Sequence, residues 1–256
     1  MLPAFSVVIP VFNEADRIGE TLRLTIQYLL ANSPSSEVIV VNDGSTDATS
    51  EMSRRAFASA RGIATRLLEN NPNRGKGTAV RAGLLAATRP LALFSDADLS
   101  TPMSEAPKLL EPIVAGEVDI AFGSRALNRK LIGRRQPWRR EQAGRVFNLL
   151  VRLSTGLPFW DTQCGFKAFR VDVCRPIIEA AQTDGFGFDV ELLYLAQQAR
   201  LRMREIPVRW DHHEGSKVDF LRDSVRMLRE VLALRVARPP SPGAPVREAR
   251  VASDLT

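Results

Sequence analysis

The sequence has few of the residues that hold small secreted or zinc-binding domains together, with only two cysteines and two histidines among its 256 residues. Cys164 and Cys174 cannot make a disulfide framework, and their spacing matches no zinc pattern. We therefore expect both to be structural thiols in a reducing compartment. His212 and His213 are adjacent, and adjacent side chains on a strand point to opposite faces, so we expect no metal ion shared between them.

Long apolar segments are absent as well. No stretch of about 18 apolar residues occurs, so no helix is expected to span a bilayer. The apolar run at residues 5–9 is short and is followed by Pro10, which does not fit a signal peptide. We expect a cytoplasmic protein whose contact with a membrane, at its inner face, is peripheral.

Charge of one sign is concentrated in one segment. The chain carries a formal net charge of +6, while residues 125–152 alone carry nine basic residues and one acid, a net charge of +8. The basic residues are Arg125, Arg129, Lys130, Arg134, Arg135, Arg139, Arg140, Arg145 and Arg152. Such a patch indicates an anionic partner, either a phosphate, a nucleic acid or an anionic membrane. The alternative is a solvated face without a partner.

Apolar runs alternate with helical patterns along the chain. The predicted strands are residues 5–9, 37–41, 65–68, 90–95, 118–122 and 206–210. The predicted helices are residues 15–30, 47–60, 77–87, 102–110, 142–154, 185–200 and 218–236. This alternation predicts an α/β fold, a Rossmann-like and mostly parallel sheet flanked by helices, in which ligands bind beyond the carboxyl ends of the strands.

The end of the chain has a different pattern. Residues 218–236 predict a basic amphipathic helix, which either lies in a membrane interface or packs on the domain. Residues 237–256 begin with a proline-rich stretch and are predicted to be a disordered tail. The globular domain is therefore expected to cover residues 1–236.

The clearest chemical motif is Asp96-Ala97-Asp98, directly after the predicted strand at residues 90–95. Two carboxylates at a strand end suit a hard cation, because Mg²⁺ or Mn²⁺ favours oxygen ligands and keeps positions open for substrate phosphate. The alternative is that Asp98 or Ser100 caps the following helix. Asp96 and Asp98 are thus the predicted metal ligands.

Polar residues follow other strands in the same way. Asn13 and Glu14 come just after the first strand, and Asp43 comes just after the second. Asp43 is suited to accept a charge-assisted hydrogen bond from a base or ribose. Residues 73–77, Asn-Arg-Gly-Lys-Gly, open a helix, where glycine amides and Lys76 could face an anion.

Taken together, these motifs carry a resemblance to a known family. Residues 9–14, 41–45, 73–77, 96–98 and 123–125 resemble inverting family-2 glycosyltransferases of the GT-A fold. Residues 161–167, 188–194 and 210–217 resemble dolichyl-phosphate glucosyltransferases more narrowly, with dolichyl-phosphate mannose synthases as close relatives. Asn42 departs from the pattern, because many relatives have an aspartate there. We also expect this chain to lack the membrane anchor that relatives carry.

The resemblance implies roles for individual residues. The implied donor-binding residues are Pro10, Phe12, Glu14, Val41, Asp43, Lys76, Asp96, Ala97, Asp98 and Lys217. The implied catalytic residues are Asp98, Asp189 and Arg125. The implied acceptor-binding residues are Arg125, Arg135 and Arg139. Asp189 stands where related transferases keep a base, but a phosphate acceptor is already ionised near neutral pH, so an orienting role is equally open.

The function implied by the resemblance is inverting transfer of a hexose to a polyprenyl or dolichyl phosphate, with a divalent metal ion. Glucose from UDP-glucose is the expected donor; GDP-mannose as donor and a non-lipid acceptor are the alternatives. Residues 1–124 would bind the nucleotide sugar and residues 125–236 the acceptor. The basic segment would then meet a lipid phosphate and an anionic membrane surface, with Leu149 and Leu150 expected in the core.

Other classes fit the sequence less well. A nucleic-acid groove should lack clustered carboxylates, whereas Glu14, Asp43, Asp96 and Asp98 are predicted at the site. A nucleotidyltransferase would leave residues 161–167 and 188–194 without a purpose. A dinucleotide oxidoreductase should have a glycine-rich GxGxxG after the first strand, which this chain lacks.

Overall fold

The computed structural model describes residues 2–134, 138–212, 227 and 229–231. Within them, seven strands form one sheet in the order β3-β2-β1-β4-β6-β5-β7. The strands are β1 (Phe5–Val11), β2 (Glu37–Asp43), β3 (Ala64–Asn70), β4 (Leu91–Ser95), β5 (Ile120–Ser124), β6 (Phe166–Arg170) and β7 (Met203–Pro207). All neighbours are parallel except β6, which is antiparallel to both β4 and β5. The carboxyl ends of the parallel strands therefore meet at one edge.

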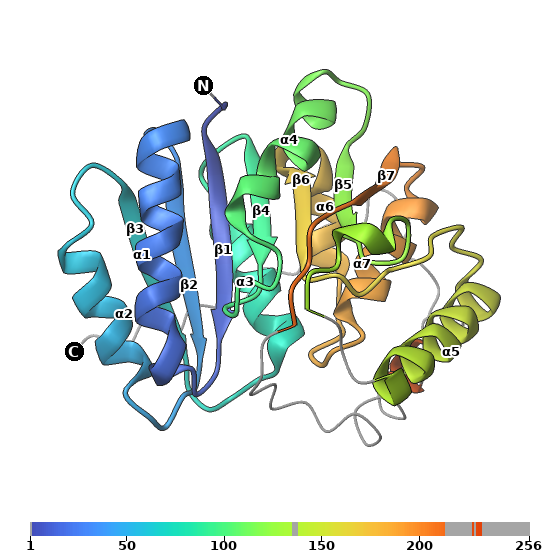
Figure 1. The fold of residues 1–256 in the computed structure, drawn as a ribbon, viewed down its shortest axis with the longest axis horizontal. Coiled ribbons are helices and arrows are strands. Elements are labelled where there is room, and N and C mark those ends of the chain that lie inside the picture. The colour runs from blue at the N-terminus through green and yellow to red at the C-terminus, as the bar shows by residue number, and fades with distance from the viewer. Residues whose placement is uncertain (1, 135–137, 213–226, 228, 232–256) are drawn as a thin grey trace, which may run out of the picture.

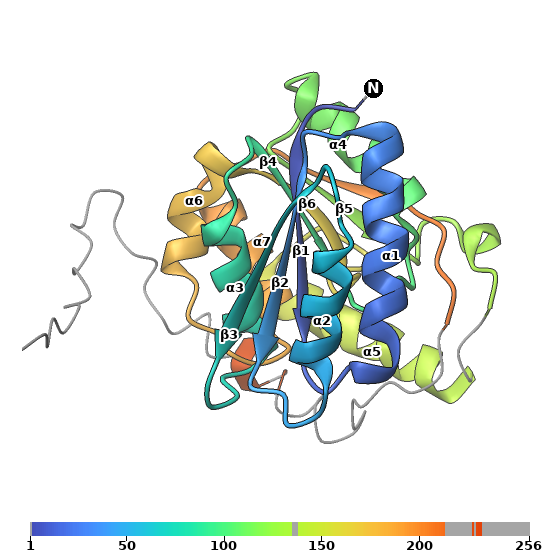
Figure 2. The ribbon, with the colours of Figure 1, turned by 90° about the vertical axis from the view of Figure 1, so that its left-hand side faces the viewer.

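Helices cover both faces of the sheet (Figures 1 and 2). They are α1 (Ala15–Asn32), α2 (Thr49–Ala58), α3 (Lys76–Ala86), α4 (Ala106–Val114), α5 (Trp138–Thr155), α6 (Val171–Ala180) and α7 (Phe188–Gln198), with short 3-10 turns at Met103–Glu105 and Arg129–Leu131. Helices α1, α2 and α4 lie on one face, and α3, α6 and α7 lie on the other (Figure 2). Helix α5 lies to the lower right in Figure 1, toward the edge where β1 and β2 end.

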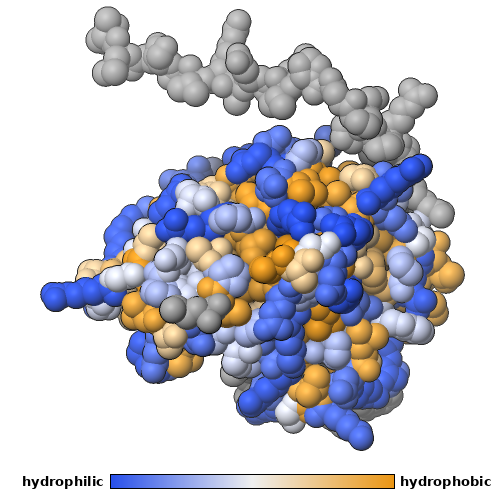
Figure 3. All heavy atoms as spheres, turned by 90° about the horizontal axis from the view of Figure 1, so that it is seen from above, coloured by the Kyte–Doolittle hydropathy of each residue, from blue (hydrophilic) through white to orange (hydrophobic). Residues whose placement is uncertain are grey.

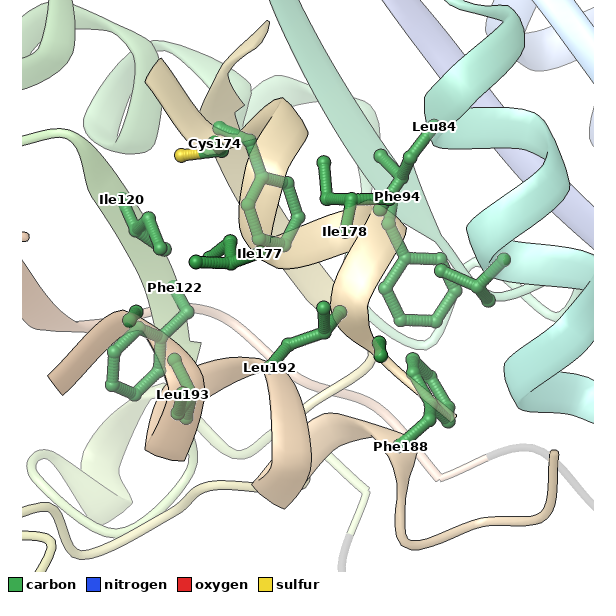
Figure 4. Packing of buried hydrophobic residues seen from close by; sticks show 14 of the residues in the cluster. Leu84, Phe94, Ile120, Phe122, Cys174, Ile177, Ile178, Phe188, Leu192 and Leu193 are labelled. Carbon is green, nitrogen blue, oxygen red and sulfur yellow. The ribbon is translucent and has the colours of Figure 1, made fainter. Parts of the chain in front are cut away.

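Two hydrophobic cores follow from this layering. Alternate residues of β2 face opposite sides, so Val38 and Val40 belong to the core on the side of α1 and α4, while Ile39 and Val41 belong to the core on the side of α3, α6 and α7. The second core is closed by aromatic and aliphatic side chains from strands and helices (Figure 4). The rings of Phe94 and Phe188 meet there in a T-shaped, edge-to-face arrangement, with ring centroids 5.7 Å apart. Helix α7 is thereby fixed against the strand that ends in the aspartate motif.

The face at the end of the sheet where β1 begins is polar at its rim. Seen from above Figure 1, blue hydrophilic side chains spread around apolar atoms in the middle of the face (Figure 3). The apolar residues exposed over α1 and α4 include Leu30 and Val114. In the part of the chain that the structure describes, no helix has both the length and the apolar character needed to cross a membrane.

The predicted α/β fold with a mostly parallel sheet is confirmed, but one strand and one helix were missed. No element was predicted for β6 and α6 (Phe166–Ala180 together), of which only Phe166 and Lys167 fall in the motif at residues 161–167. The last strand pairs Met203 with Ile120 and Pro207 with Ser124, so β7 begins three residues before the predicted 206–210. Apolar residues in Met203–Pro207 are only partly buried because β7 is an edge strand, which weakened the pattern.

The expectation that Leu149 and Leu150 belong to the core is wrong. Their exposed fractions are 52% and 40%, whereas Phe147 and Val151 on the same helix are buried. Four residues make slightly more than one helical turn, so Phe147 and Val151 share one face, and that face meets the core. Most of the predicted helix at 218–236 and the whole tail at 237–256 lie outside the described residues.

Both cysteines are buried, and burial raises the pKa of each thiol to about 12, with Asp161 adding to the effect at Cys164 and Asp119 at Cys174. Because the thiolate is the reactive form, we expect alkylation by iodoacetamide at pH 8 to be about a thousandfold slower than for an ordinary cysteine of pKa near 8.5. Mass spectrometry should show no adduct in the native protein and two after unfolding. Rapid native labelling of either residue would contradict this burial.

Candidate functional site

The site is built where β2 ends, around the buried carboxylate of Asp43. This carboxylate accepts hydrogen bonds from the Asn70 side chain (2.8 Å) and from the backbone amides of Arg74 (3.1 Å) and Gly75 (2.7 Å). Asn73 donates to the Asp43 carbonyl oxygen at 2.8 Å. A carboxylate has about four acceptor positions, so Asp43 orders the loop before α3 and keeps capacity for a further donor.

Three amides of the 73–77 loop, including those of both glycines, are satisfied by the protein itself. Gly75 and Arg74 donate to Asp43, and the Gly77 amide donates to the Asp184 carbonyl oxygen at 2.8 Å. The prediction that glycine amides of this loop face an anion is therefore wrong. The glycines permit close packing instead, since a Cβ at Gly77 would lie 2.2 Å from the Thr183 carbonyl oxygen.

Lys76, by contrast, does point to the predicted metal motif. Its ammonium nitrogen lies 2.6 Å from Asp96 Oδ1 and 5.6 Å from the centroid of the Phe94 ring. Burial lowers the pKa of Lys76, but the carboxylates of Asp96, Asp189 and Asp98 outweigh burial and hold that pKa above its ordinary value. A permanent positive charge thus sits beside the aspartates.

The aspartate motif follows β4 as predicted. Asp96 and Asp98 are partly exposed, whereas Ala97 between them is buried and its carbonyl oxygen accepts a bond from the Thr21 hydroxyl. Asp98 Oδ1 accepts the Ser100 amide at 2.9 Å, but this bond lies within the turn. The alternative that Asp98 or Ser100 caps the following helix is wrong, because the N-cap residues are Pro102 for the 3-10 turn and Glu105 for α4. Asp96 and Asp98 thus present two partly exposed carboxylates just after β4, a position called here the mouth of the site. The bond to Ala97 anchors the turn between them on α1.

Strand β6 approaches this turn closely. The Asp96 amide donates to the Gly165 carbonyl oxygen at 3.1 Å, and a Cβ at Gly165 would lie 1.9 Å from Asp96 Oδ2. Only glycine leaves room for the Asp96 carboxylate in its observed position. Gly165 therefore positions a predicted metal ligand, a role that the sequence did not reveal.

Asp189 is buried at the start of α7 and is paired with Lys167 of β6. The Lys167 ammonium is fully buried and donates to Asp189 Oδ1 at 2.5 Å and to the Cys164 carbonyl oxygen at 2.6 Å. Burial raises the pKa of Asp189, against the opposing effects of Lys167 and Lys76. The pair ties β6 to α7 directly beneath the aspartate motif.

Arg125 is held by a buried acid. Its guanidinium donates to Asp161 through Nε (2.7 Å) and Nη2 (2.8 Å), and its amide donates to the same carboxylate at 2.9 Å. Burial opposes the charge on Arg125, but Asp161 raises its pKa. Glu205 of β7 in turn accepts the Asp161 amide at 2.8 Å. Two guanidinium nitrogens of Arg125, the residue predicted to bind phosphate, are thus already bonded to Asp161 within the protein.

The other predicted site residues differ in their accessibility. Phe12 is 42% exposed, while Pro10 and Val41 are buried, so the side chain of Val41 packs in the core and cannot contact a ligand. Glu14 pairs with Arg17 at 2.7 Å. Arg135 and Lys217 lie outside the described residues, and of Arg139 only the helical backbone is described.

The aspartate motif has the oxygen donors that a divalent cation requires. Among the described residues, no group of three or more His, Cys, Asp or Glu side chains is placed to hold a metal ion. Two carboxylates nevertheless fit Mg²⁺ or Mn²⁺, because such ions are commonly bound through one or two carboxylates together with substrate phosphates. Asp96 and Asp98 would be the protein ligands.

Comparison with known proteins decides the family. The family model described as glycosyl transferase family 2 matches residues 6–178, which include every strand that frames the site except β7. The chain belongs to glycosyl transferase family 2. It is therefore an enzyme, a glycosyltransferase, and the nucleic-acid, nucleotidyltransferase and oxidoreductase alternatives are excluded.

Individual relatives of this family-2 glycosyltransferase narrow the comparison. A dolichyl-phosphate beta-glucosyltransferase of Drosophila melanogaster is 36% identical over 242 residues, covering 90% of this chain and 74% of that protein. The enzyme of the same name from Saccharomyces cerevisiae is 34% identical, covering 91% and 74%. Glycosyltransferase AglD of Haloferax volcanii is 35% identical over 89% of this chain, but the chain spans only 36% of AglD.

Solved structures of a glucosyl-3-phosphoglycerate synthase have the same fold. Glucosyl-3-phosphoglycerate synthase from Mycobacterium tuberculosis, in complex with phosphoglyceric acid, superimposes with a TM-score of 0.66 at 21% identity, covering 94% of this chain and 82% of that one. The same synthase in complex with Mn²⁺, UDP and glucosyl-3-phosphoglycerate also has a TM-score of 0.66. The GT-A architecture is thereby shown for this chain.

Proposed function

We propose that this glycosyltransferase transfers glucose from UDP-glucose, with inversion, to a dolichyl or polyprenyl phosphate. The proposal rests on Asp96 and Asp98 at the end of β4, beside Lys76 and the ordered loop on Asp43. It is supported by relatives named dolichyl-phosphate beta-glucosyltransferase, of which the chain covers about three quarters. The assignment of roles to single residues is part of this proposal.

The reaction brings together two negatively charged groups, the phosphate of the acceptor and the diphosphate of the donor. An oxygen of the acceptor phosphate forms a bond to the anomeric carbon, while the bond from that carbon to the diphosphate oxygen breaks and UDP leaves. A divalent cation held by Asp96 and Asp98 would neutralise charge on the leaving diphosphate. Lys76 contacts Asp96 at 2.6 Å and would add a positive charge at the same place.

Asp189 has an orienting role in this proposal. Its carboxylate is buried and bonded to Lys167, so it holds β6 and α7 in fixed relation. An acceptor phosphate has a second pKa of about 6 and needs no proton removed near neutral pH. The pair therefore preorganises the site rather than accepting a proton from the acceptor.

A donor and acceptor screen tests the proposed function. Purified protein with Mg²⁺ or Mn²⁺ should form a glycolipid from UDP-glucose and polyprenyl phosphate, identified by its mass, and little from GDP-mannose. Phosphoglyceric acid serves as the soluble acceptor for comparison. Transfer only from GDP-mannose, or only to the soluble acceptor, would replace the proposed substrates while leaving the family assignment intact.

Substitution of Arg139, a residue of the basic segment, tests whether this segment binds the acceptor phosphate. A charge-assisted bond to phosphate is worth roughly 1.5–3 kcal/mol, so Arg139→Ala should raise KM for polyprenyl phosphate about tenfold to a hundredfold. The dissociation constant of UDP, measured by calorimetry, should stay unchanged. Arg61→Ala, an exposed arginine between α2 and β3, is the control. Weakened UDP binding with normal acceptor kinetics would move Arg139 to the donor site.

We also propose that the enzyme works as a peripheral protein on the inner, cytoplasmic face of an anionic membrane. The lipid acceptor and the net charge of +8 on residues 125–152 support this location. Attraction between exposed arginines and an anionic leaflet is screened within a Debye length, so binding should weaken as salt is added.

A further inference from the structure

Helix α5 is apolar on two sides. One side, with Phe147 and Val151, is buried in the core cluster that also contains Met227 and Val231. The other side is exposed. It consists of Val146, Leu149, Leu150 and Leu153, named here the α5 stripe. The spacing of three, four and seven residues places these side chains on one face of the helix, and Leu153 is 69% exposed.

The α5 stripe is unusual within the described chain. Ten large hydrophobic residues are substantially exposed among the described residues. Four of them lie on this one face of α5, whereas the others are spread over several elements. Single exposed apolar residues are ordinary, but a contiguous apolar face on a soluble domain marks an interaction surface. The α5 stripe therefore requires an apolar neighbour.

The surroundings of the stripe indicate which neighbour. Arg145 is exposed on the same helix, and the Arg152 guanidinium lies 3.9 Å from the centroid of the Trp160 ring, which is itself 56% exposed. Helix α5 contains four arginines and one acid, Glu141. Arginine and tryptophan beside an apolar face are typical of residues at the boundary between lipid headgroups and acyl chains.

A second copy of the chain fits this surface less well. A two-fold contact through the α5 stripe would bring Arg145 and Arg152 of one helix toward those of the other, because such an interface joins the same patch on both subunits. Lipid phosphates, in contrast, complement those arginines while the acyl region accepts the leucines. Charge complementarity thus favours an anionic bilayer.

We propose that the α5 stripe inserts into the interface of an anionic lipid bilayer and docks the enzyme there. Helix α5 lies toward the edge of the sheet at which β1, β2 and β4 end (Figure 1), so docking through it brings the mouth at Asp96 and Asp98 toward the membrane. This assignment rests on the proposed lipid acceptor for its purpose, but its test does not depend on activity.

Site-specific fluorescence tests the proposal on the full chain. Because Cys164 and Cys174 are buried, a cysteine introduced by Leu153→Cys can be labelled selectively with a polarity-sensitive nitrobenzoxadiazole dye. Vesicles of phosphatidylcholine and phosphatidylglycerol should increase and blue-shift its emission. The same dye after Leu24→Cys on α1, where Leu24 is 41% exposed, should not respond. A response at Leu24 alone, or at neither residue while the protein co-floats with vesicles, would overturn the docking face.

Vesicle flotation measures how much the α5 stripe contributes to the free energy of membrane binding. The double variant Leu149→Gln with Leu153→Gln should lower the partition coefficient for these vesicles about tenfold to a hundredfold. The matched control, Leu24→Gln with Leu30→Gln on α1, should leave it unchanged. Both double variants should melt like the parent, because all four residues are exposed.

Activity separates failure of the docking face from failure of the proposed function. With acceptor dissolved in detergent, the α5 double variant should transfer glucose at the parental rate. Absence of transfer in every variant together with stripe-dependent flotation would refute the function and retain the docking face. A concentration-dependent dimer in light scattering, abolished by the α5 double variant, without vesicle binding would identify a second copy as the neighbour and overturn the proposal.

Discussion

Asp98→Asn is expected to lower the transfer rate roughly a thousandfold while leaving the fold intact. Loss of one anionic metal ligand should remove about 4 kcal/mol of transition-state stabilisation. The fold should persist because Asp98 Oδ1 accepts the Ser100 amide, and an asparagine side chain keeps an acceptor oxygen for that bond. The initial rate of glycolipid formation from UDP-glucose, at saturating Mg²⁺, measures the effect.

Two further measurements make this result specific. The dissociation constant of Mn²⁺ in the presence of UDP, followed by electron paramagnetic resonance, should rise in Asp98→Asn independently of turnover. Asp172→Asn, which changes an exposed aspartate of α6, should behave like the parent in both assays. Turnover of Asp98→Asn at the parental rate would show that the aspartate motif is not the metal site.

Lys167→Met is expected to destabilise the protein by about 3–5 kcal/mol. The change leaves the Asp189 carboxylate buried without its cation, and removing one partner of a buried ion pair has a cost of this size. Urea unfolding followed by circular dichroism measures the difference in free energy of unfolding. Lys108→Met is the matched control, because Lys108 pairs with Glu105 at a similar 2.6 Å but is 43% exposed, and such a pair contributes about 1 kcal/mol or less.

The pH dependence of the Lys167→Met defect follows from Asp189. Burial already raises the pKa of Asp189 in the parent, so its ionised form is disfavoured by folding, and the variant should raise that pKa further. A group with a raised pKa in the folded state favours folding at low pH and loses that contribution as pH rises through the folded pKa. The defect should therefore be largest at neutral pH and shrink on acidification. A defect that is independent of pH would mean that packing of the lysine stem, not charge, is responsible.

The parts of the fold that the sequence predicted are those with a local signal. The runs that became β1, β2 and β4 are apolar because they are buried on both faces, and each is followed directly by a polar motif. Strand β6 has no such pattern. Its residues Phe166–Arg170 include a fully buried lysine, whose partner Asp189 lies 22 residues further along the chain. A pair of that kind is visible only when the fold brings both residues together.

In the candidate site, too, the sequence predicted the features that have a local pattern and missed those that depend on contacts between distant residues. The strand-end position and partial exposure of Asp96 and Asp98 match the sequence prediction, because a strand end followed by acids is a short-range pattern. The partner of Arg125, by contrast, lies at Asp161 and the acceptors of the 73–77 loop lie at Asp43 and Asp184, far apart in sequence. Without these contacts, glycines that allow tight packing are indistinguishable from glycines that bind an anion.

The antiparallel strand β6 has a consequence for how the chain is synthesised. After residue 124 has left the ribosome, β3, β2, β1 and β4 can already pair in their final order, because all four are complete. Strand β5 is also complete, yet both its neighbours, β6 and β7, are still to be translated. The nascent chain must therefore hold β5 and one edge of β4 unpaired for more than 40 further residues, until β6 arrives between them. Exposed strand edges bind other chains, so a stop codon shortly before β6 should yield an aggregating fragment rather than a smaller domain.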